Sequence, residues 1–305
     1  MGLREEIIKK LEEPMMSRDE ILERWKAELE EGRPIIYVGC SAGIVAKAAE
    51  LAGMDAIVVY ETGLSRHWGL PTTMLRDPNS YTFKMFPEIR NVVSNIPVIA
   101  GLECYDQKYW GKRGLRRLLR QAIELGADGI QNFPTLAFLP TVAKLRDTVN
   151  MGWQRELEMI RLCKELNIFT MWYALYPEQA RDVAEAGADV IVPHCGWTHG
   201  GVTGAPYIKR WEDRKYHAAI IPISDKDKAC EWVQEIIDAA KSVKKDIIAL
   251  AHGGPWATPE DVEYLLTHTD AVGFEAASAF ERIPTESAVR DVVRKFKNIN
   301  LKRGR

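Results

Sequence analysis

One unit recurs along this chain: a helix that ends at a glycine, then an acidic residue, then a short apolar strand. It occurs in "ELAGMDAIVVYETG" (50–63), "ELGADGIQNFP" (124–134) and "EAGADVIVPHCG" (185–196). Glycine suits the residue after a helix because it adopts the left-handed conformation without strain. An apolar run without alternation is typical of a strand in a parallel sheet covered on both faces. The recurrence therefore predicts repeated αβ units.

Eight such strands can be placed along the chain. We expect them at residues 34–40, 56–60, 97–103, 129–133, 168–173, 190–194, 247–254 and 271–276. Helical patterns fill the intervals, for example at 153–167 and 177–187. Eight strands joined by right-handed crossovers predict an α/β fold, the (β/α)₈ TIM barrel. A doubly wound open sheet is the alternative, although such sheets usually have fewer strands.

The first 33 residues lie outside this pattern. The sequence "SRDE" (17–20) has the spacing of a capping box and predicts one extra helix before the first strand. No stretch rich in Ser, Gly and Pro divides the rest of the chain. We therefore expect an N-terminal helical extension (1–33) and a single TIM-barrel domain (34–305).

Composition restricts the compartment and the partners. Basic and acidic residues number 41 and 43 and are spread along the chain, which disfavours nucleic acid as a partner. No segment approaches the roughly 20 apolar residues of a membrane span, and the N-terminus has no signal-like apolar core. Five scattered cysteines without a CxxC pair disfavour both a disulfide framework and a zinc ribbon. These features predict a cytoplasmic protein with no membrane partner.

Two histidines stand at the ends of neighbouring strands. The loops after the strands build the active site of a barrel, and His194 and His252 follow the sixth and seventh strands. Imidazole suits proton transfer because its ordinary pKa is near neutral pH. One such histidine would more often be structural, but two at equivalent positions favour a catalytic role.

Three glutamates also follow apolar strands, namely Glu61, Glu103 and Glu275. A buried carboxylate is costly unless it is paired, bound to metal or catalytic. We expect Glu61 and Glu275 to be catalytic, and Glu103 with Glu61 to hold a divalent metal. Carboxylates suit Mg²⁺ or Mn²⁺, whereas added histidines would favour a transition metal such as Zn²⁺. The alternative is ion pairing with a nearby arginine, such as Arg66 or Arg282.

An anion site is expected after the last two strands. The segments "HGGP" (252–255) and "EAASAFER" (275–282) place small residues and free backbone N–H groups where barrels often hold a phosphate. Ordinary turns are the alternative, since glycine also serves those. The candidate residues for binding a small anionic substrate are Gln131, Asn132, Gly253, Gly254, Ala277, Ser278 and Arg282.

Aromatic residues in the loops predict a homo-oligomer. Such side chains line a pocket or anchor a partner subunit. The long connection at 196–224 is expected to be a lid or a subunit contact, and the sequence leaves that choice open. The aromatics concerned are Trp68, Tyr81, Trp110, Trp197 and Trp211.

Several of these segments together resemble one family. "GIQNFPT" (129–135), "YPEQARDVAEAGADVIVPHCGWTHGG" (176–201), "HGGPWATPEDVEYLL" (252–266) and "GFEAASAFERIPTESAV" (273–289) are similar to the phosphoenolpyruvate hydrolase-like family of barrels. That family resembles the phosphoenolpyruvate mutase and isocitrate lyase superfamily, and also the barrel half of a plant antiviral resistance protein. The resemblance runs over about residues 35–297. Its pattern carries over at Gln131, Asn132, His194, Gly196, His252, Gly253, Gly254, Ser278, Glu281 and Arg282.

The resemblance implies a lyase or hydrolase for a small carboxylate, a 2-oxo acid or an enol phosphate, acting through a metal-stabilised enolate. The alternative is a catalytically silent barrel that binds a protein or a ligand. This chain departs from the family at Glu61-Thr62-Gly63, where Asn-Ser-Gly is usual, and at Glu103-Cys104-Tyr105-Asp106, where the pattern is Cys-Gly-Thr-Asp. Two added carboxylates suggest altered chemistry.

Overall fold

The computed structural model describes residues 14–205 and 223–300. In this part of the chain nine parallel strands form one sheet in the order β7-β6-β5-β4-β3-β2-β1-β9-β8. The order follows the chain, as expected for repeated αβ units. The strands are β1 (Ile35–Cys40), β2 (Ala56–Val59), β3 (Val98–Leu102), β4 (Gly129–Asn132), β5 (Phe169–Ala174), β6 (Val190–Pro193), β7 (Ile248–Ala249), β8 (Ala251–His252) and β9 (Gly273–Ala276).

Strands β7 and β8 are two halves of the predicted seventh strand, interrupted at Leu250. β7 pairs with β6, and β8 pairs with β9. A bridge between His194 and His252 joins the two sides of the interruption. The strands therefore form a nearly closed barrel, and the predicted TIM-barrel fold is confirmed.

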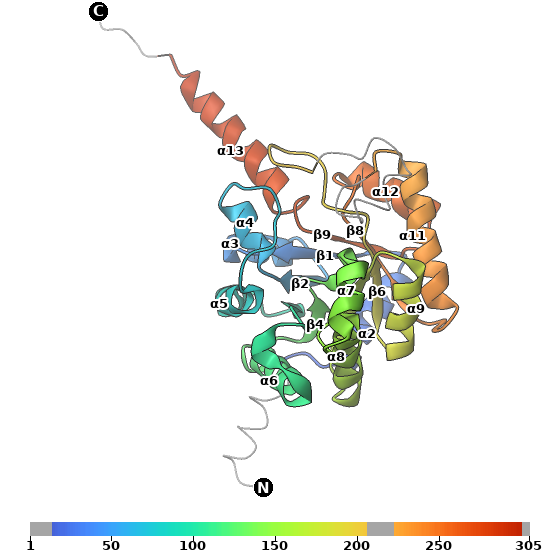
Figure 1. Cartoon of the computed structure of the whole chain (residues 1–305). Helices are drawn as coiled ribbons and strands as arrows, with labels where there is room; N and C mark the ends of the chain where they lie inside the picture. Colours follow the sequence, from blue (N-terminus) through green and yellow to red (C-terminus); the bar gives the residue numbers. More distant parts are fainter. Residues whose placement is uncertain (1–13, 206–222, 301–305) are drawn as a thin grey trace, which may run out of the picture.

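Helices surround the strands (Figure 1). Each apolar strand is therefore covered by helices on its outer face. This burial on both faces is why continuous apolar runs predicted the strands correctly. The last helix, α13, is different because it projects from the barrel (Figure 1). The helices are α2 (Arg18–Glu30), α3 (Gly43–Leu51), α4 (Thr62–His67), α5 (Pro78–Arg90), α6 (Gly111–Glu124), α7 (Pro140–Asp147), α8 (Trp153–Glu165), α9 (Pro177–Ala186), α11 (Lys226–Lys241), α12 (Pro259–His268) and α13 (Arg282–Lys297), with short 3₁₀ turns at Gln107–Tyr109 and Leu136–Phe138.

Helix α2 is the predicted extra helix before the barrel. Ser17 accepts a hydrogen bond from the Glu20 N–H at 3.2 Å, which is one half of the expected capping box. Its Trp25 is buried against Tyr37 and Phe169, with ring centroids 6.3 and 5.3 Å away. The helix therefore packs against strands β1 and β5. Whether residues 1–33 form a separate unit stays a prediction.

The acidic residue of the recurring unit has a structural role. Asp55, Asp128 and Asp189 each stand just before a strand and accept a backbone N–H of the neighbouring strand, from Ile36, Val98 and Thr170 respectively. Asp128 also accepts from the Met16 N–H at 2.7 Å and pairs with Arg90 at 2.8 Å. The glycines before them, Gly53, Gly126 and Gly187, have φ of 86°, 95° and 98°. The repeat thus ends each helix and ties adjacent strands together.

Two further observations concern the chain as a whole. In the described part, no helix is long and apolar enough to cross a membrane. All five cysteines are free and buried. Most of the long connection at 196–224, with Trp211, lies outside the described residues, so its predicted role as lid or subunit contact stays a prediction.

Candidate active site

A narrow pocket of about 10 Å³, about the space of one water molecule, lies where the strands end, the place predicted for the site. Its walls come from the segments that follow β2, β4, β6, β8 and β9, so residues more than 200 positions apart meet there. We call it the rim pocket. It is lined by Tyr60, Thr62, Arg66, Thr72, Phe133, Trp197, Thr198, His252, Ala277 and Ser278.

The two predicted histidines lie together. Their ring centroids are 4.5 Å apart, and both side chains are buried. His252 Nδ1 lies 2.9 Å from the Glu275 carbonyl oxygen, which assigns the proton to Nδ1 and leaves a lone pair on Nε2. His194 Nδ1 accepts from the Gly196 N–H at 3.0 Å, so its proton is on Nε2. Among the described residues, that N–H has no partner.

Both imidazoles are neutral at neutral pH. Burial lowers the pKa of His252 to about 3, because the charged form loses its hydration. Burial, together with the nearby His252, also holds the pKa of His194 well below its usual value. The site therefore presents one imidazole lone pair and one N–H donor rather than two cations.

Arg66 supplies a buried cation to the rim pocket. Its Nη2 lies 2.8 Å from Glu281 Oε2, and Glu281 Oε1 accepts from the N–H and hydroxyl of Ser41. The Arg66 side chain is 1% exposed. Sequence reasoning considered Arg66 only as a partner for a rim glutamate, and the glutamate it actually meets is Glu281. The signal in the sequence that could have identified Arg66 was its position on the helix that follows the second strand.

Glu275 points into the barrel beneath the histidines. It accepts hydrogen bonds from the hydroxyls of Tyr37 and Tyr173 and from Gln131 Nε2, the last at 2.8 Å. Burial raises the pKa of Glu275 to about 7. The predicted residues Gln131 and Glu275 therefore meet, but neither lines the rim pocket directly.

Asn132 is occupied by other contacts. Its Nδ2 donates to Glu156 at 2.8 Å, and its Oδ1 accepts from the Tyr173 N–H at 2.7 Å. Glu156, from helix α8, also accepts from Thr135 and the Leu136 N–H. Asn132 thus shapes the loop after β4 instead of presenting a free amide. Sequence reasoning missed Glu156, whose only signal was an acidic residue within an otherwise ordinary amphipathic helix.

The glycine pair packs loops together. The Gly254 N–H donates to the Gly196 carbonyl at 2.7 Å, so the expectation of a free N–H there is wrong. Gly253 has φ of 72°, and a Cβ on it would lie 2.1 Å from the Gly196 oxygen. Neither glycine lines the rim pocket, whereas Ala277 and Ser278 do. The glycines are therefore needed for close approach of the loops after β6 and β8.

Arg282, the last predicted anion ligand, binds protein groups instead. Its Nη2 donates to the Gly200 carbonyl at 2.9 Å, and its Nη1 pairs with Glu286 at 3.2 Å. It does not line the rim pocket. Its contacts instead connect the start of α13 to the loop after β6.

Glu61 and Glu103, the two predicted metal ligands, are carboxyl groups whose pKa is raised. Glu61 is fully buried, and within the described residues neither of its carboxylate oxygens has a hydrogen-bond partner. Burial raises the pKa of Glu61 to about 8, and burial with nearby Asp106 raises that of Glu103 to about 7. The arginines that could have paired with them bind Glu281 and Glu286 instead. Neither glutamate lines the rim pocket, although Glu61 stands in the sequence between the lining residues Tyr60 and Thr62.

The donor set suits only one kind of metal. Across residues 14–205 and 223–300, no group of three or more His, Cys, Asp and Glu side chains could hold an ion. Zn²⁺ generally takes three or four protein ligands, and the described residues do not bring such a set together. Mg²⁺ keeps several waters and takes one or two carboxylates, for which the orphaned oxygens of Glu61 are available.

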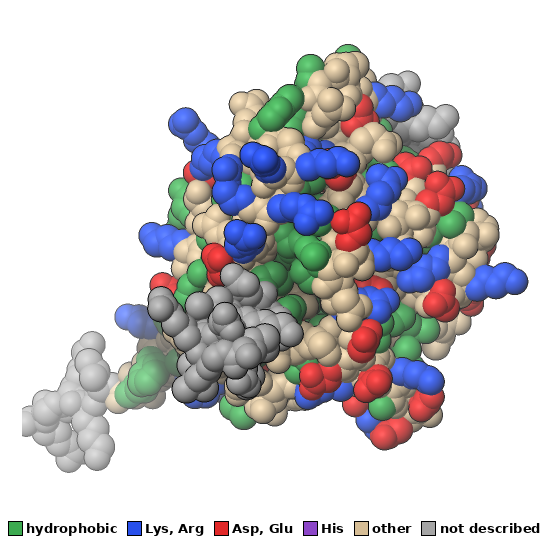
Figure 2. Space-filling model, turned by 90° about the horizontal axis from the view of Figure 1, so that it is seen from below, with side chains coloured by type: hydrophobic (Ala, Val, Ile, Leu, Met, Phe, Trp, Pro, Cys, Tyr) green, Lys and Arg blue, Asp and Glu red, His purple; other side chains and the backbone are tan. Residues whose placement is uncertain are grey.

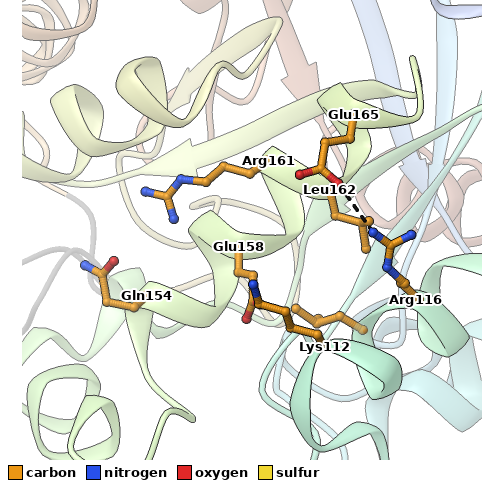
Figure 3. Close-up of a pocket in the computed structure, with 8 residues that line it drawn as sticks. Lys112, Arg116, Gln154, Glu158, Arg161, Leu162 and Glu165 are labelled. Carbon is orange, nitrogen blue, oxygen red and sulfur yellow. Dashed lines mark hydrogen bonds and ion pairs between the residues drawn. The ribbon is translucent and has the colours of Figure 1, made fainter.

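A second hollow on the outside of the barrel has no comparable features. It measures about 360 Å³ and lies between helices α6 and α8, where Lys112, Arg116 and Arg161 alternate with Glu158 and Glu165 (Figure 3). Arg116 reaches Glu165 at 3.4 Å. The face seen in Figure 2 likewise carries basic and acidic side chains interspersed. Solvated mixed charge of this kind is ordinary protein surface.

Comparisons with solved structures confirm the fold. A phosphonopyruvate hydrolase in complex with oxalate and Mg²⁺ is 20% identical with a TM-score of 0.55, covering 92% of this chain and 87% of that one. Oxaloacetate acetylhydrolase with the inhibitor 3,3-difluorooxalacetate is 16% identical with a TM-score of 0.56, covering 94% and 88%.

Comparisons with protein sequences show the family. The ToMV resistance protein Tm-1(GCR237) of Solanum lycopersicum is 34% identical over 295 residues, which are 95% of this chain and 37% of that protein. A putative transcriptional regulatory protein, y4pA, of Sinorhizobium fredii is 26% identical over 94% of this chain and 45% of its own length. The chain therefore spans less than half the length of these relatives. A model of the phosphoenolpyruvate hydrolase-like family matches residues 20–299, and the chain belongs to that family.

Proposed function

We propose that this protein is an enzyme that acts on a small carboxylate, a 2-oxo acid or an enol phosphate, through an enolate-like intermediate, as a lyase or a hydrolase. The observation that carries the proposal is the rim pocket, where the buried guanidinium of Arg66 lies with the neutral imidazole of His252 and with hydroxyl groups. Two structures with the same fold were solved with small dicarboxylates, oxalate and difluorooxalacetate, and these ligands support the substrate class.

Arg66 binds the substrate anion in this scheme. A guanidinium has five N–H donors, and Glu281 Oε2 accepts a hydrogen bond only from that on Nε, at 3.0 Å, although Nη2 lies 2.8 Å from it as an ion pair. The remaining contact, from Nη1 to the Thr62 hydroxyl, is long at 3.5 Å. A planar carboxylate suits these donors because two parallel N–H bonds can form. The hydroxyls of Ser278 and Thr72, 3.5 Å apart, provide further donors.

His252 moves the proton. Its Nδ1–H is held by the Glu275 carbonyl, so the Nε2 lone pair is the atom left for the substrate. With a pKa of about 3 the imidazole is a weak base until an anion enters the pocket. The anion favours the charged imidazolium and so raises this pKa. Substrate binding thereby prepares His252 to take a proton from the carbon next to the carbonyl, and the Nε2–H of His194 is a donor for the resulting enolate oxygen.

Glu61 and Glu103 would hold a divalent cation, with Mg²⁺ the best fit. When bound, the cation supplies a Lewis acid that polarises an oxygen of the substrate. Because burial raises the pKa of both carboxyl groups, protons compete with the metal. Calorimetric titration with Mg²⁺ alone should therefore show binding that tightens from pH 6 to pH 8. No heat at any pH would remove the cation from this scheme.

The test of the proposal compares two histidines. The wild type is assayed against phosphoenolpyruvate and a panel of 2-oxo acids, and oxalate binding is measured by calorimetry. His252→Asn keeps a donor for the Glu275 carbonyl but loses the base, so kcat should fall on the order of 10²-fold. His268→Asn is the matched control, because His268 is exposed on α12, and it should leave kcat unchanged.

Equal rates in both variants would return His252 to a structural role. If no compound in the panel reacts and oxalate does not bind, the rival function, a catalytically silent binding barrel, becomes the better account. A cytoplasmic location stays a prediction, which the free cysteines support.

A further inference from the structure

We propose that Glu275 is the counter-ion of His252, and that its buried carboxylate stabilises the imidazolium that forms when His252 takes the substrate proton. Glu275 does not line the rim pocket, so it acts through His252 as a positioning residue. The inference rests on the proposed function, because it concerns the base of that reaction. It adds the group that lets a buried, neutral imidazole accept a positive charge.

Strand pairing places the two residues side by side. His252 on β8 is in register with Glu275 on β9, and Glu275 is in register with Tyr37 on β1. The main-chain carbonyl oxygen of Glu275 lies 2.9 Å from His252 Nδ1. Its side-chain Oε1 lies 4.0 Å from the same nitrogen. Glu275 therefore fixes the tautomer of His252 with its carbonyl group and brings a carboxylate close to the same ring.

The partners of the Glu275 carboxylate suit its ionised form. The carboxylate accepts hydrogen bonds from the hydroxyls of Tyr37 and Tyr173 and from Gln131 Nε2. An ionised carboxylate is only an acceptor, whereas a protonated one also needs an acceptor for its own proton. Donors from three other strands thus point at one buried carboxylate, and hydrogen bonds of this kind favour its charged form.

Among the described residues that face this pair, only Glu275 changes its charge near neutral pH. Burial raises the pKa of Glu275 to about 7. The tyrosines keep their protons because burial raises their pKa, and His194 stays neutral because burial lowers its pKa. The titratable and charged groups that face Glu275 and His252 are Tyr37 from β1, Tyr60 after β2, Arg66 from α4 with its partner Glu281, Tyr173 from β5 and His194 after β6.

Removal of the substrate proton creates the charge that Glu275 balances. The proton passes from the substrate carbon to His252 Nε2, and the electron pair of the C–H bond stays on the substrate as the enolate. His252 then carries an N–H group on each ring nitrogen and a positive charge. Glu275 exchanges no proton in this step, and its negative charge attracts the imidazolium across 4.0 Å in a site shielded from water. A protonated Glu275 lacks this attraction, so the rate depends on its ionisation.

Kinetics across the pH range test the counter-ion, with the most reactive compound of the panel. Excess Mg²⁺ is present throughout, so that protons on Glu61 and Glu103 do not limit the rate. The wild-type kcat/KM should rise through pH 7 as Glu275 ionises, because this ratio reports the free enzyme. Glu275→Gln should lose that rise and, at pH 8, lower kcat on the order of 10²-fold with little change in KM.

Two further variants accompany Glu275→Gln. Tyr37→Phe removes one donor from the carboxylate, which disfavours its charged form, so the rise in kcat/KM should move to higher pH. Glu235→Gln makes the same substitution at an exposed position on α11 and should keep the wild-type profile. Circular dichroism checks that each variant is folded.

Nuclear magnetic resonance of protein labelled in its histidines requires no turnover. His252→Asn identifies the His252 signals among those of the six histidines. Without ligand, these signals should shift near pH 7 as Glu275 ionises, although the ring stays neutral, and Glu275→Gln should abolish the shift. With oxalate bound, His252 should take up its proton at a pH lower by about 2 in Glu275→Gln, because one of two nearby anions is gone.

The outcomes separate this inference from the proposed function. If His252→Asn loses activity but Glu275→Gln keeps the wild-type pH profile and the wild-type His252 signals, the counter-ion is overturned and His252 remains the base. An equal loss of kcat at every pH in Glu275→Gln, with no shift of the His252 signals near pH 7 in the wild type, would give Glu275 a structural role. If no compound reacts and oxalate does not bind, the proposed function fails and the counter-ion fails with it.

Discussion

Buried carboxylates at the two ends of the barrel differ in their partners. At the end of the barrel where the strands begin, which we call the entry end, Asp128 accepts hydrogen bonds from two backbone N–H groups and pairs with Arg90. At the opposite end, where the strands finish and which we call the exit end, Glu61 is equally buried. Within the described residues, however, neither of its carboxylate oxygens has a hydrogen-bond partner. The same chemical group therefore stabilises the fold at one end and costs stability at the other. Such a cost is retained at functional sites, where a perturbed pKa or an open ligand position is useful.

Glu156 shows that partners, and not position alone, decide which role a carboxylate has. It lies at the exit end, but Asn132, Thr135 and the Leu136 N–H satisfy it as fully as Asp128 is satisfied. The comparison thus predicts three different responses to removal of a buried carboxylate, and they can be ordered by size.

The largest effect is expected at the entry end. Asp128→Ala leaves Arg90 and two backbone N–H groups buried without their partner, which should lower the free energy of unfolding by about 3–5 kcal/mol. Urea unfolding followed by tryptophan fluorescence measures it. Glu235→Ala, at an exposed position on α11, is the control and should change the free energy by less than about 0.5 kcal/mol. Equal changes in the free energy of unfolding for Asp128→Ala and Glu235→Ala would contradict a stabilising role for Asp128.

Glu156→Ala should also lower the free energy of unfolding, by about 3 kcal/mol. The decrease is smaller than for Asp128→Ala because no arginine is left unpaired. The loop after β4 would also lose its support, so oxalate binding should weaken in parallel. A free energy of unfolding unchanged from the wild type would mean that exit-end carboxylates contribute little even when satisfied.

Glu61→Gln should act in the opposite direction. Burial raises the folded-state pKa of Glu61 to about 8, above its ordinary value of 4.5, so the folded protein holds a proton that the unfolded chain releases. This contribution is full below pH 4.5 and is lost as pH rises through 8. Glutamine removes the dependence, so the variant should exceed the wild type by about 4 kcal/mol at pH 8 and match it near pH 4.5. Urea unfolding across this range measures the difference, and parallel pH profiles would contradict it.

The sequence predicted most of the barrel because its signals are local. Each strand is a short apolar run and each helix an amphipathic one, so neighbouring residues suffice to place them. The interruption at Leu250 and the projection of α13 were not predictable, because both depend on what packs against the segment. Exposed Val292 and Phe296 look the same in the sequence as buried ones.

The site was predictable only where its residues directly follow strands. His194 and His252 were predicted in this way, and their rings do lie together, whereas their catalytic role stays a prediction. The pair of Arg66 and Glu281 spans 215 positions, and no local pattern connects them. The Gly254 N–H was expected to be free, but it donates to the Gly196 carbonyl, a contact that no local pattern indicates. Anion binding by the glycine pair stays a prediction.

The hydrogen bonds from Ser41 and Arg66 to Glu281 also bear on synthesis. Glu281 follows Ser41 by 240 positions and Arg66 by 215, so a nascent chain carries Arg66 without this partner until residue 281 has been made. A product that stops short of residue 281 keeps seven and a half αβ units yet leaves that arginine buried without its counter-ion or exposed. The burial of Arg66 with its counter-ion therefore depends on a segment that is made only after all the strands of the barrel.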